Sequence, residues 1–276
     1  MAELMFDSHA HYFDQRFRSS DGGDVDLLLR TEVFGNNVGH VVNVGTNPRT
    51  SRLAIEMAKR YSGMYASVGI HPEDAQFLES TPEEAIAEIE SMIQDPILRK
   101  ENKIVALGEI GYDYHEWANG GFTPDKAVQK IYFEQQMSLA DRYSMPVIIH
   151  DRDAHGDCFE TVLRYPNVIG VFHSYSGSAE MARELMRRGY YISFSGVVTF
   201  KNAPRVKEVA ASIPLEHLLI ETDAPYLAPH PHRGKKNHSG LMCHTAEEIA
   251  RLKGVSIEEV IRITAENAAR LYGVVL

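Results

Sequence analysis

The sequence contains very little cysteine. Its two cysteines, Cys158 and Cys243, are too few for a disulfide-rich scaffold or for a zinc site built from cysteine. The sequence also lacks a run of about 18 apolar residues, so we expect no membrane-spanning helix. Residues 1–13 have neither the basic start nor the apolar stretch of a signal peptide. We therefore expect a cytoplasmic protein that does not associate with a membrane.

Basic residues are also scarce. The chain has 28 Lys and Arg against 38 Asp and Glu, a net charge of −10. This balance argues against a protein that coats nucleic acid through a broad basic face. It does not exclude an enzyme that grips a few phosphates through metal ions or a small basic loop.

Short apolar segments recur along the chain. They are continuous and rich in β-branched residues, which is typical of strands covered on both faces. They comprise residues 4–6, 41–44, 65–70, 104–107, 147–149, 168–172, 190–193 and 218–220. Helical patterns lie between or after them, at 49–60, 81–93, 127–142, 179–188 and 245–252. The helix at 81–93 opens with Thr81 as N-cap, a proline at the first helical position and two glutamates.

The alternation of strands and helices predicts the fold. Its spacing of very roughly 30 residues is that of a strand–helix–strand unit. No linker divides the chain, so we expect one domain over residues 1–276, an α/β protein with a (β/α)8 TIM barrel. An open doubly wound sheet is the alternative, but no Gly-rich phosphate-binding motif follows the first strand.

Histidines and carboxylates follow several of the predicted strands. They are His9, His11, His71, Glu109, His150, His173 and Asp223. The carboxyl ends of barrel strands meet at one mouth, so we expect these side chains to share one small space. Imidazoles and carboxylates bind divalent metals, and seven such groups exceed one tetrahedral set. Two adjacent ions are therefore the natural interpretation.

Each of these residues also has a structural interpretation when taken alone. A single histidine at a strand end is more often a hydrogen-bonded structural residue, Glu109 could cap a helix, and Asp223 could belong to a turn. Placing all of them at one mouth without a metal would bury several uncompensated charges. Their combination favours the metal site.

Two further groups are candidates for substrate contact. Arg233, Lys235 and Lys236 form the strongest local basic cluster, which is either a phosphate clamp at the mouth or a solvated loop. Aromatic residues cluster after the fourth strand, and they either stack on bases or cover the barrel. They are Tyr112, Tyr114, Trp117 and Phe122, of which we expect Tyr112 to contact substrate.

Five motifs resemble those of the TatD family of metal-dependent deoxyribonucleases, which are TIM barrels of the amidohydrolase superfamily. They are Asp-Ser-His-Ala-His at 7–11, Gly-Ile-His-Pro at 69–72, Gly-Glu-Ile-Gly-Tyr-Asp at 108–113, His-Ser-Tyr-Ser-Gly at 173–177 and Glu-Thr-Asp-Ala-Pro at 221–225. Residues 129–140 and 264–271 resemble two helices of the family, so the resemblance covers essentially the whole chain.

The resemblance implies a ligand set for two divalent ions, which would be Zn, Mn or Mg. One ion would be held by His9, His11 and Asp223, the other by His150 and His173, with Glu109 bridging. His71 would support the ligands or contact substrate, and Asp223 would orient the attacking water and accept its proton.

The implied activity is cleavage of phosphodiester bonds in DNA by metal-activated water. An acidic protein with a narrow mouth suits an end of a single strand better than an internal duplex site. Hydrolysis of an ester or amide, such as the aminoacyl ester of a mischarged tRNA, is an alternative. A metal-stabilised interaction platform without activity is a lesser one.

The chain departs from the family pattern at several places. Ser174-Tyr175 replaces the common Cys-Phe, and His238 replaces a common Glu. The loops at 19–24 and 116–122 look enlarged. These differences leave the expected ligands intact and bear on substrate preference.

Overall fold

The computed structural model describes residues 4–17, 24–117 and 122–276. Eight parallel strands lie in the order of the sequence in one sheet. They are β1 (Met5–Ala10), β2 (Val38–Val44), β3 (Met64–Val68), β4 (Ile104–Asp113), β5 (Val147–Arg152), β6 (Gly170–Phe172), β7 (Tyr191–Phe194) and β8 (Leu218–Ile220). The predicted α/β barrel is confirmed.

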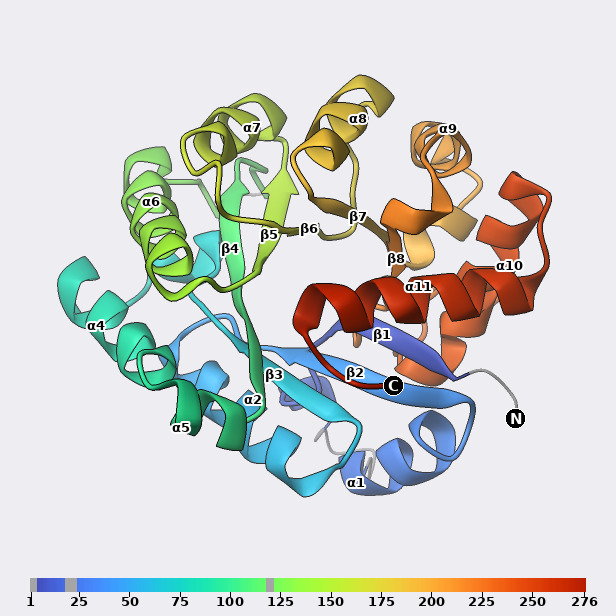
Figure 1. Cartoon of the computed structure of the whole chain (residues 1–276), viewed down its shortest axis with the longest axis horizontal. Helices are drawn as coiled ribbons and strands as arrows, with labels where there is room; N and C mark the ends of the chain where they lie inside the picture. Colours follow the sequence, from blue (N-terminus) through green and yellow to red (C-terminus); the bar gives the residue numbers. More distant parts are fainter. Residues whose placement is uncertain (1–3, 18–23, 118–121) are drawn as a thin grey trace.

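Helices surround the strands (Figure 1). The α-helices are α1 (Val25–Leu28), α2 (Pro48–Arg60), α3 (Pro72–Ala75), α4 (Pro82–Ile93), α5 (Pro96–Glu101), α6 (Lys126–Tyr143), α7 (His155–Leu163), α8 (Ala179–Arg187), α9 (Pro204–Ser212), α10 (Cys243–Lys253) and α11 (Ile257–Tyr272). Short helical turns are η1 (Gln15–Phe17), η2 (Leu29–Val33), η3 (Gly196–Thr199), η4 (Leu215–His217) and η5 (Ser239–Met242).

The first and last strands close the barrel through the segment that follows β8. The amide of His11 donates to the carbonyl of Ala224 at 2.7 Å, and the amide of Asp223 donates to the carbonyl of His9 at 2.9 Å. The buried carboxylate of Asp7 accepts hydrogen bonds from both the amide and the hydroxyl of Thr222, at 3.0 and 2.6 Å. This seam brings His9, His11 and Asp223 together at the mouth.

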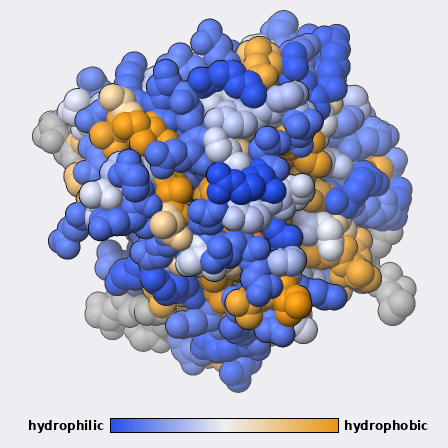
Figure 2. All heavy atoms as spheres, turned by 60° about the vertical axis from the view of Figure 1, so that its left-hand side comes forward, coloured by the Kyte–Doolittle hydropathy of each residue, from blue (hydrophilic) through white to orange (hydrophobic). Residues whose placement is uncertain are grey.

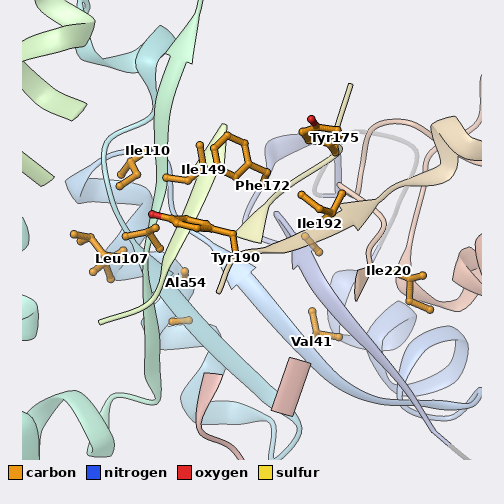
Figure 3. Close-up of a cluster of buried hydrophobic side chains, with 14 of the residues drawn as sticks. Val41, Ala54, Leu107, Ile110, Ile149, Phe172, Tyr175, Tyr190, Ile192 and Ile220 are labelled. Carbon is orange, nitrogen blue, oxygen red and sulfur yellow. The ribbon is translucent and has the colours of Figure 1, made fainter. Parts of the chain in front are cut away.

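The apolar core has two parts. Strand side chains that face the helices form the larger part, and Figure 3 shows Leu107, Ile110, Ile149, Phe172 and Ile192 within it. The smaller part combines inward-facing side chains of the strands with one face of α11. It includes the strand residues Phe6, Val42, Ala106, Ile148 and Leu219 and the α11 residues Ala265, Ala268 and Tyr272. The hydroxyl of Tyr272 donates to the carbonyl of Ser8 at 3.2 Å. The amino-terminal end of the barrel is therefore filled with apolar side chains and closed by α11.

The helix ends follow local sequence signals. Thr81 caps α4 in a capping box with Glu84, and Pro82 occupies the first helical position, as predicted. Asn47 caps α2 in the same way, with Thr50 as its partner. These caps satisfy amide groups that a helix leaves without partners at its start.

Several strands are longer than the apolar runs predict. β4 continues to Asp113 and β5 to Arg152, so Glu109 and His150 lie within strands rather than after them. Apolar runs underestimate the lengths of these strands, because residues whose polar side chains face the mouth also take part in the backbone pairing of the sheet. Of the loops expected at 19–24 and 116–122, residues 19–23 and 118–121 lie outside the described residues.

The molecular surface is mostly hydrophilic on the side drawn in Figure 2, with small separate hydrophobic patches. Within the described ranges, no helix has both the length and the apolarity needed to cross a bilayer.

Candidate metal centre

The structure brings all the predicted histidines and carboxylates together. A cleft of about 670 Å³ opens at the carboxyl ends of the strands. It is lined by six of the seven, namely His11, His71, Glu109, His150, His173 and Asp223. The seventh, His9, is fully buried and lies 3.1 Å from His11, measured between their Nε2 atoms.

A first set of donor atoms surrounds Oε2 of Glu109. This oxygen lies 3.4 Å from Nε2 of His9 and 3.7 Å from Nε2 of His11. Oδ1 of Asp223 lies 3.7 and 3.3 Å from the same two nitrogens. Ligands about 2.1 Å from one tetrahedral ion lie roughly 3.4 Å from each other, so the spacing of this set fits a divalent ion.

A second set surrounds the other oxygen of the same carboxylate. Oε1 of Glu109 lies 2.8 Å from Nδ1 of His150 and 2.8 Å from Nε2 of His173. These two nitrogens are 3.1 Å apart. One carboxylate thus offers one oxygen to each set, which is the arrangement of a bridging ligand.

The outer ring nitrogens of three histidines are held by acceptors. Nδ1 of His11 donates to the carbonyl of Val44 at 2.7 Å, and Nε2 of His150 donates to Oδ2 of Asp113 at 2.9 Å. Nδ1 of His173 faces Oε1 of Glu221 at 3.3 Å. Each acceptor assigns the proton to the outer nitrogen, which leaves the lone pair of the inner nitrogen for a metal.

The donor chemistry of the second set fits a cation. With these protons assigned, Nδ1 of His150, Nε2 of His173 and Oε1 of Glu109 are all acceptors, 2.8–3.1 Å apart. Acceptors this close repel one another unless a positive charge lies between them. The residues therefore fit a bound divalent ion.

The same demand for positive charge appears in the pKa values. Burial disfavours the charged form of His150, but hydrogen bonds to Asp113 and Glu109 outweigh it and raise the pKa of His150 to about 9. Burial would also raise the pKa of Glu109, yet nearby imidazoles, His173 foremost, hold it well below its usual value. A divalent ion would supply the same charge without a proton.

His71 differs from the other histidines. Its Nδ1 accepts the amide of Glu73 at 3.1 Å, at the start of α3. The proton must then be on Nε2, which faces Oε1 of Glu109 at 3.5 Å. A protonated nitrogen donates hydrogen bonds and does not ligate a metal. His71 is suited to donate to an oxygen atom in the cleft.

Two residues with positive φ angles, Gly111 and Asp223, shape the backbone around the site. Gly111 has a φ of 146°, and a side chain there would collide with the carbonyl of His150 on the neighbouring strand. The missing side chain lets β4 and β5 approach beside Glu109. Asp223 has a φ of 57°, in the left-handed region that aspartate tolerates better than most residues.

Three carboxylates that support the site were not among the residues predicted from the sequence. Asp7, Asp113 and Glu221 are buried and lie around the histidines rather than among the donor sets. Asp7 accepts the amide of His9 at 3.2 Å and the hydroxyl of Ser239 at 2.6 Å. All three carboxylates belong to the motifs that contain the donors, which was the available signal.

The expectation that Tyr112 contacts substrate is corrected. Its side chain is 2% exposed, packs edge-on against Phe133 with ring centroids 4.9 Å apart, and shares a hydrogen bond with Thr161. The physical reason is the extension of β4. Side chains alternate along a strand, so Glu109 and Tyr112 point to opposite faces.

The basic cluster lies beside the cleft rather than in it. Arg233, Lys235 and Lys236 are exposed, and the described lining of the cleft does not include them. The guanidinium of Arg233 lies over the ring of Phe200, 4.3 Å from its centroid. These cations can therefore reach only groups that extend beyond the cleft.

The cleft itself is acidic. Among its described lining residues, carboxylates outnumber arginines seven to two: Asp14, Glu73, Asp74, Glu109, Asp113, Asp151 and Asp223 against Arg16 and Arg152. An anionic ligand would be repelled from this cleft unless bound cations offset the carboxylates.

Known proteins resemble the chain along its full length. The family model described as "TatD related DNase" matches residues 6–273. An "Uncharacterized metal-dependent hydrolase YabD" of Bacillus subtilis (strain 168) is 42% identical over 98% of this chain and 99% of that protein. An "Uncharacterized metal-dependent hydrolase TatD" of Mycobacterium tuberculosis is 35% identical over 98% of each chain.

Solved structures show the same likeness. The crystal structure of YJJV, a TatD homolog from Escherichia coli K12, superimposes with a TM-score of 0.85 and 25% identity, covering all of both chains. A TatD family hydrolase from Entamoeba histolytica superimposes with a TM-score of 0.80 over 99% of each chain, at 23% identity. With its barrel and its histidine–carboxylate cluster, the chain belongs to the TatD family of metal-dependent hydrolases.

Proposed function

We propose that this hydrolase is a deoxyribonuclease that cleaves phosphodiester bonds at an end of single-stranded DNA, with two divalent ions in its cleft. The observation that carries the proposal is that the two carboxylate oxygens of Glu109 face different pairs of histidines. Its Oε2 faces His9 and His11, while its Oε1 faces His150 and His173. A carboxylate shared between two ligand sets is suited to ions about 3.5–4 Å apart, the spacing used in phosphoryl transfer.

The ligand assignment follows from the two donor sets. His9, His11 and Asp223 would hold one ion, His150 and His173 the other, with Glu109 between them. Nitrogen and carboxylate ligands admit Zn²⁺ and Mn²⁺, and Mg²⁺ is compatible with phosphoryl chemistry. When bound, such ions lower the pKa of water and stabilise negative charge on phosphoryl oxygens.

The protein's own residues then have distinct tasks. Nε2–H of His71 donates to a non-bridging phosphate oxygen, because its other nitrogen is committed to the amide of Glu73. Asp223 orients the attacking water and accepts its proton. Burial would raise the pKa of Asp223, but its hydrogen bond with His11 and the nearby imidazoles lower it, so the carboxylate is available as a base.

The acidity of the cleft supports metal-dependent binding as well as metal-dependent chemistry. Seven carboxylates line the described part of the cleft, and they repel a phosphate backbone. Two divalent ions would supply four positive charges where the scissile phosphate binds. A recessed cleft suits a strand end, which can enter it, better than the interior of a duplex.

The test is turnover of a short labelled single-stranded DNA with Mn²⁺, Mg²⁺ or Zn²⁺ added to metal-depleted protein. A single-stranded RNA and an aminoacyl ester serve as competing substrates. We expect DNA cleavage that requires metal and is lost in Glu109→Gln. The matched control is Glu56→Gln, which removes the same charge from an exposed position on α2. Hydrolysis of the aminoacyl ester without cleavage of DNA would replace this proposal with the ester hydrolase.

A further inference from the structure

One wall of the cleft carries an arginine stacked on a tyrosine. The guanidinium of Arg16, in η1 after β1, lies 4.3 Å from the ring centroid of Tyr226. The hydroxyl of Tyr226 donates to Oδ2 of Asp14 at 3.0 Å, which fixes the ring by its polar edge. All three side chains line the cleft.

A second wall repeats this construction with different residues. The guanidinium of Arg152, at the end of β5, lies 5.2 Å from the ring of Trp117. Nε1 of Trp117 donates to Oε1 of Glu73 at 3.0 Å, so this ring is also fixed by its polar edge. These three side chains line the same cleft.

The two walls lie on opposite sides of the candidate metal centre. Arg16 and Tyr226 follow β1 and β8, the strands at the seam, whereas Trp117 follows β4 and Arg152 ends β5. In a barrel of eight strands in sequence order, these two pairs of strands face each other across the axis. A ligand bridging both walls therefore passes over the histidines and carboxylates.

Both aromatic rings are open to a ligand. Trp117 is 47% exposed and Tyr226 is 38% exposed, although each lines a recessed cleft. Arg16 and Arg152 are also the two arginines of the described cleft lining, where lysine is absent. The positive charge on each wall thus lies over an aromatic ring that is still partly exposed.

We propose that these two walls bind the nucleotides on either side of the scissile phosphate. One base stacks on Trp117 and the other on Tyr226, while Arg152 and Arg16 contact the phosphates next to them. Exposed aromatic rings beside cations are the means by which proteins bind single strands without reading sequence. The inference rests on the proposed function and deepens it: the substrate must present unpaired bases on both sides of the bond.

The competing possibility is that the enzyme recognises only phosphates. A duplex would then bind as well as a single strand, because its phosphates are accessible while its base faces are covered by neighbouring bases. A strand without bases would also bind normally. Phosphate recognition by Arg16 and Arg152 does not require exposed aromatic rings, so the exposure of Trp117 and Tyr226 in the cleft favours base stacking.

The test compares an eight-nucleotide thymidine strand with a fully abasic strand that has the same phosphates. We measure kcat/KM for both with the metal-loaded protein, together with kcat/KM for bis(p-nitrophenyl) phosphate, which has no bases. We expect wild type to prefer the thymidine strand by about 100-fold, the combined effect of stacking two bases at about tenfold each. Trp117→Ala and Tyr226→Ala should each reduce this preference by about tenfold, and Trp117→Phe should restore most of it.

Phe77→Ala is the matched control, because Phe77 is 67% exposed and does not line the described cleft. Its preference for bases should equal that of wild type. Arg152 is a less decisive position, since its guanidinium also lies 3.9 Å from Asp113, which holds His150. Thermal melting of each variant checks that the fold is retained.

The outcomes separate the inference from the proposed function. Equal cleavage of the thymidine and abasic strands overturns the inference, while cleavage of either strand leaves the phosphodiesterase intact. If neither strand nor the small diester is cleaved, the proposed function fails. The ratio of the two Kd values, measured by fluorescence anisotropy on the same metal-loaded protein, then decides the inference by itself.

Discussion

Oδ2 of Asp113 lies 2.9 Å from Nε2 of His150. Asp113 ends β4 and His150 lies within β5, so two adjacent strands fix this contact. Asp113 is held in turn by two hydrogen bonds: its Oδ1 accepts the amide of His115 at 2.9 Å, and its own amide donates to the side-chain Oε1 of Gln129 at 3.0 Å. The ring of His150 is therefore oriented before any ligand arrives.

Replacing this carboxylate should weaken metal binding without removing a donor atom. In Asp113→Asn, the negatively charged acceptor for the hydrogen bond from Nε2 of His150 is replaced by a neutral amide group. We expect metal affinity at the His150–His173 set to fall about 10- to 100-fold. Isothermal titration of metal-depleted protein measures it, and Glu56→Gln is the control. An unchanged affinity would show that Asp113 does not support the ligand.

The shared carboxylate of Glu109 predicts two ions per chain. Metal-depleted protein saturated with Mn²⁺ or Zn²⁺ and freed of excess should contain up to two ions by elemental analysis. Glu109→Gln should lower this number, because the amide group binds cations more weakly than a carboxylate. A maximum of one ion in wild type at saturating metal, with weak second-site occupancy excluded by titration, would contradict the dinuclear assignment.

Asp223→Asn removes one charged donor and the proposed proton acceptor. We expect turnover to fall at least ~100-fold. The barrel should persist, since its apolar core lies on the other side of the strands and below the mouth. Circular dichroism and thermal melting check the fold. Near-normal turnover would show that the reaction occurs elsewhere.

The exposed basic cluster predicts a dependence on substrate length. Because Arg233, Lys235 and Lys236 lie outside the described cleft lining, they can reach only phosphates of a strand that extends beyond it. Replacing all three with alanine should raise KM for a long single strand. It should also flatten the log–log salt dependence by up to roughly two units, at about 0.7 per contact.

A dinucleotide provides the comparison for this triple variant. Its KM and salt dependence should match those of wild type, since it ends within the cleft. If the long strand also shows no change in KM or in salt dependence, the cluster is a solvated loop.

The N-cap of α4 tests whether stability and metal binding are separable. Thr81→Ala removes the side-chain acceptor for the amide of Glu84. We expect a loss of about 1 kcal/mol in the free energy of unfolding and a Tm lower by roughly 2–4 °C. Metal affinity should remain at the wild-type value. A parallel loss of metal affinity would indicate that α4 is coupled to the mouth of the barrel.

Local patterns in the sequence were enough for the architecture. Continuous apolar runs separated by amphipathic segments predict a barrel because buried parallel strands need apolar side chains on both faces. The same logic places His9, His11, His150 and His173 at one mouth, since strand direction determines which end each residue occupies. Thr81 was predictable as a cap because capping involves only residues adjacent in sequence.

Other features depended on contacts between distant segments. The apolar criterion ended the fourth strand at Leu107, so Tyr112 was placed after the strand and expected to contact substrate, whereas it is buried within β4. Only the pairing of β4 with β5 shows that the strand continues to Asp113.

The roles of the cleft residues were likewise decided by tertiary structure. The sequence by itself determined which strand ends bear histidines and carboxylates. Three features depend on side chains from different strands or loops. They are the placement of the two Glu109 carboxylate oxygens in different donor sets, the proton on Nε2 of His71, and the two arginine–aromatic walls. Distances and orientations across a barrel are properties of its closure, and no local pattern in the chain encodes them.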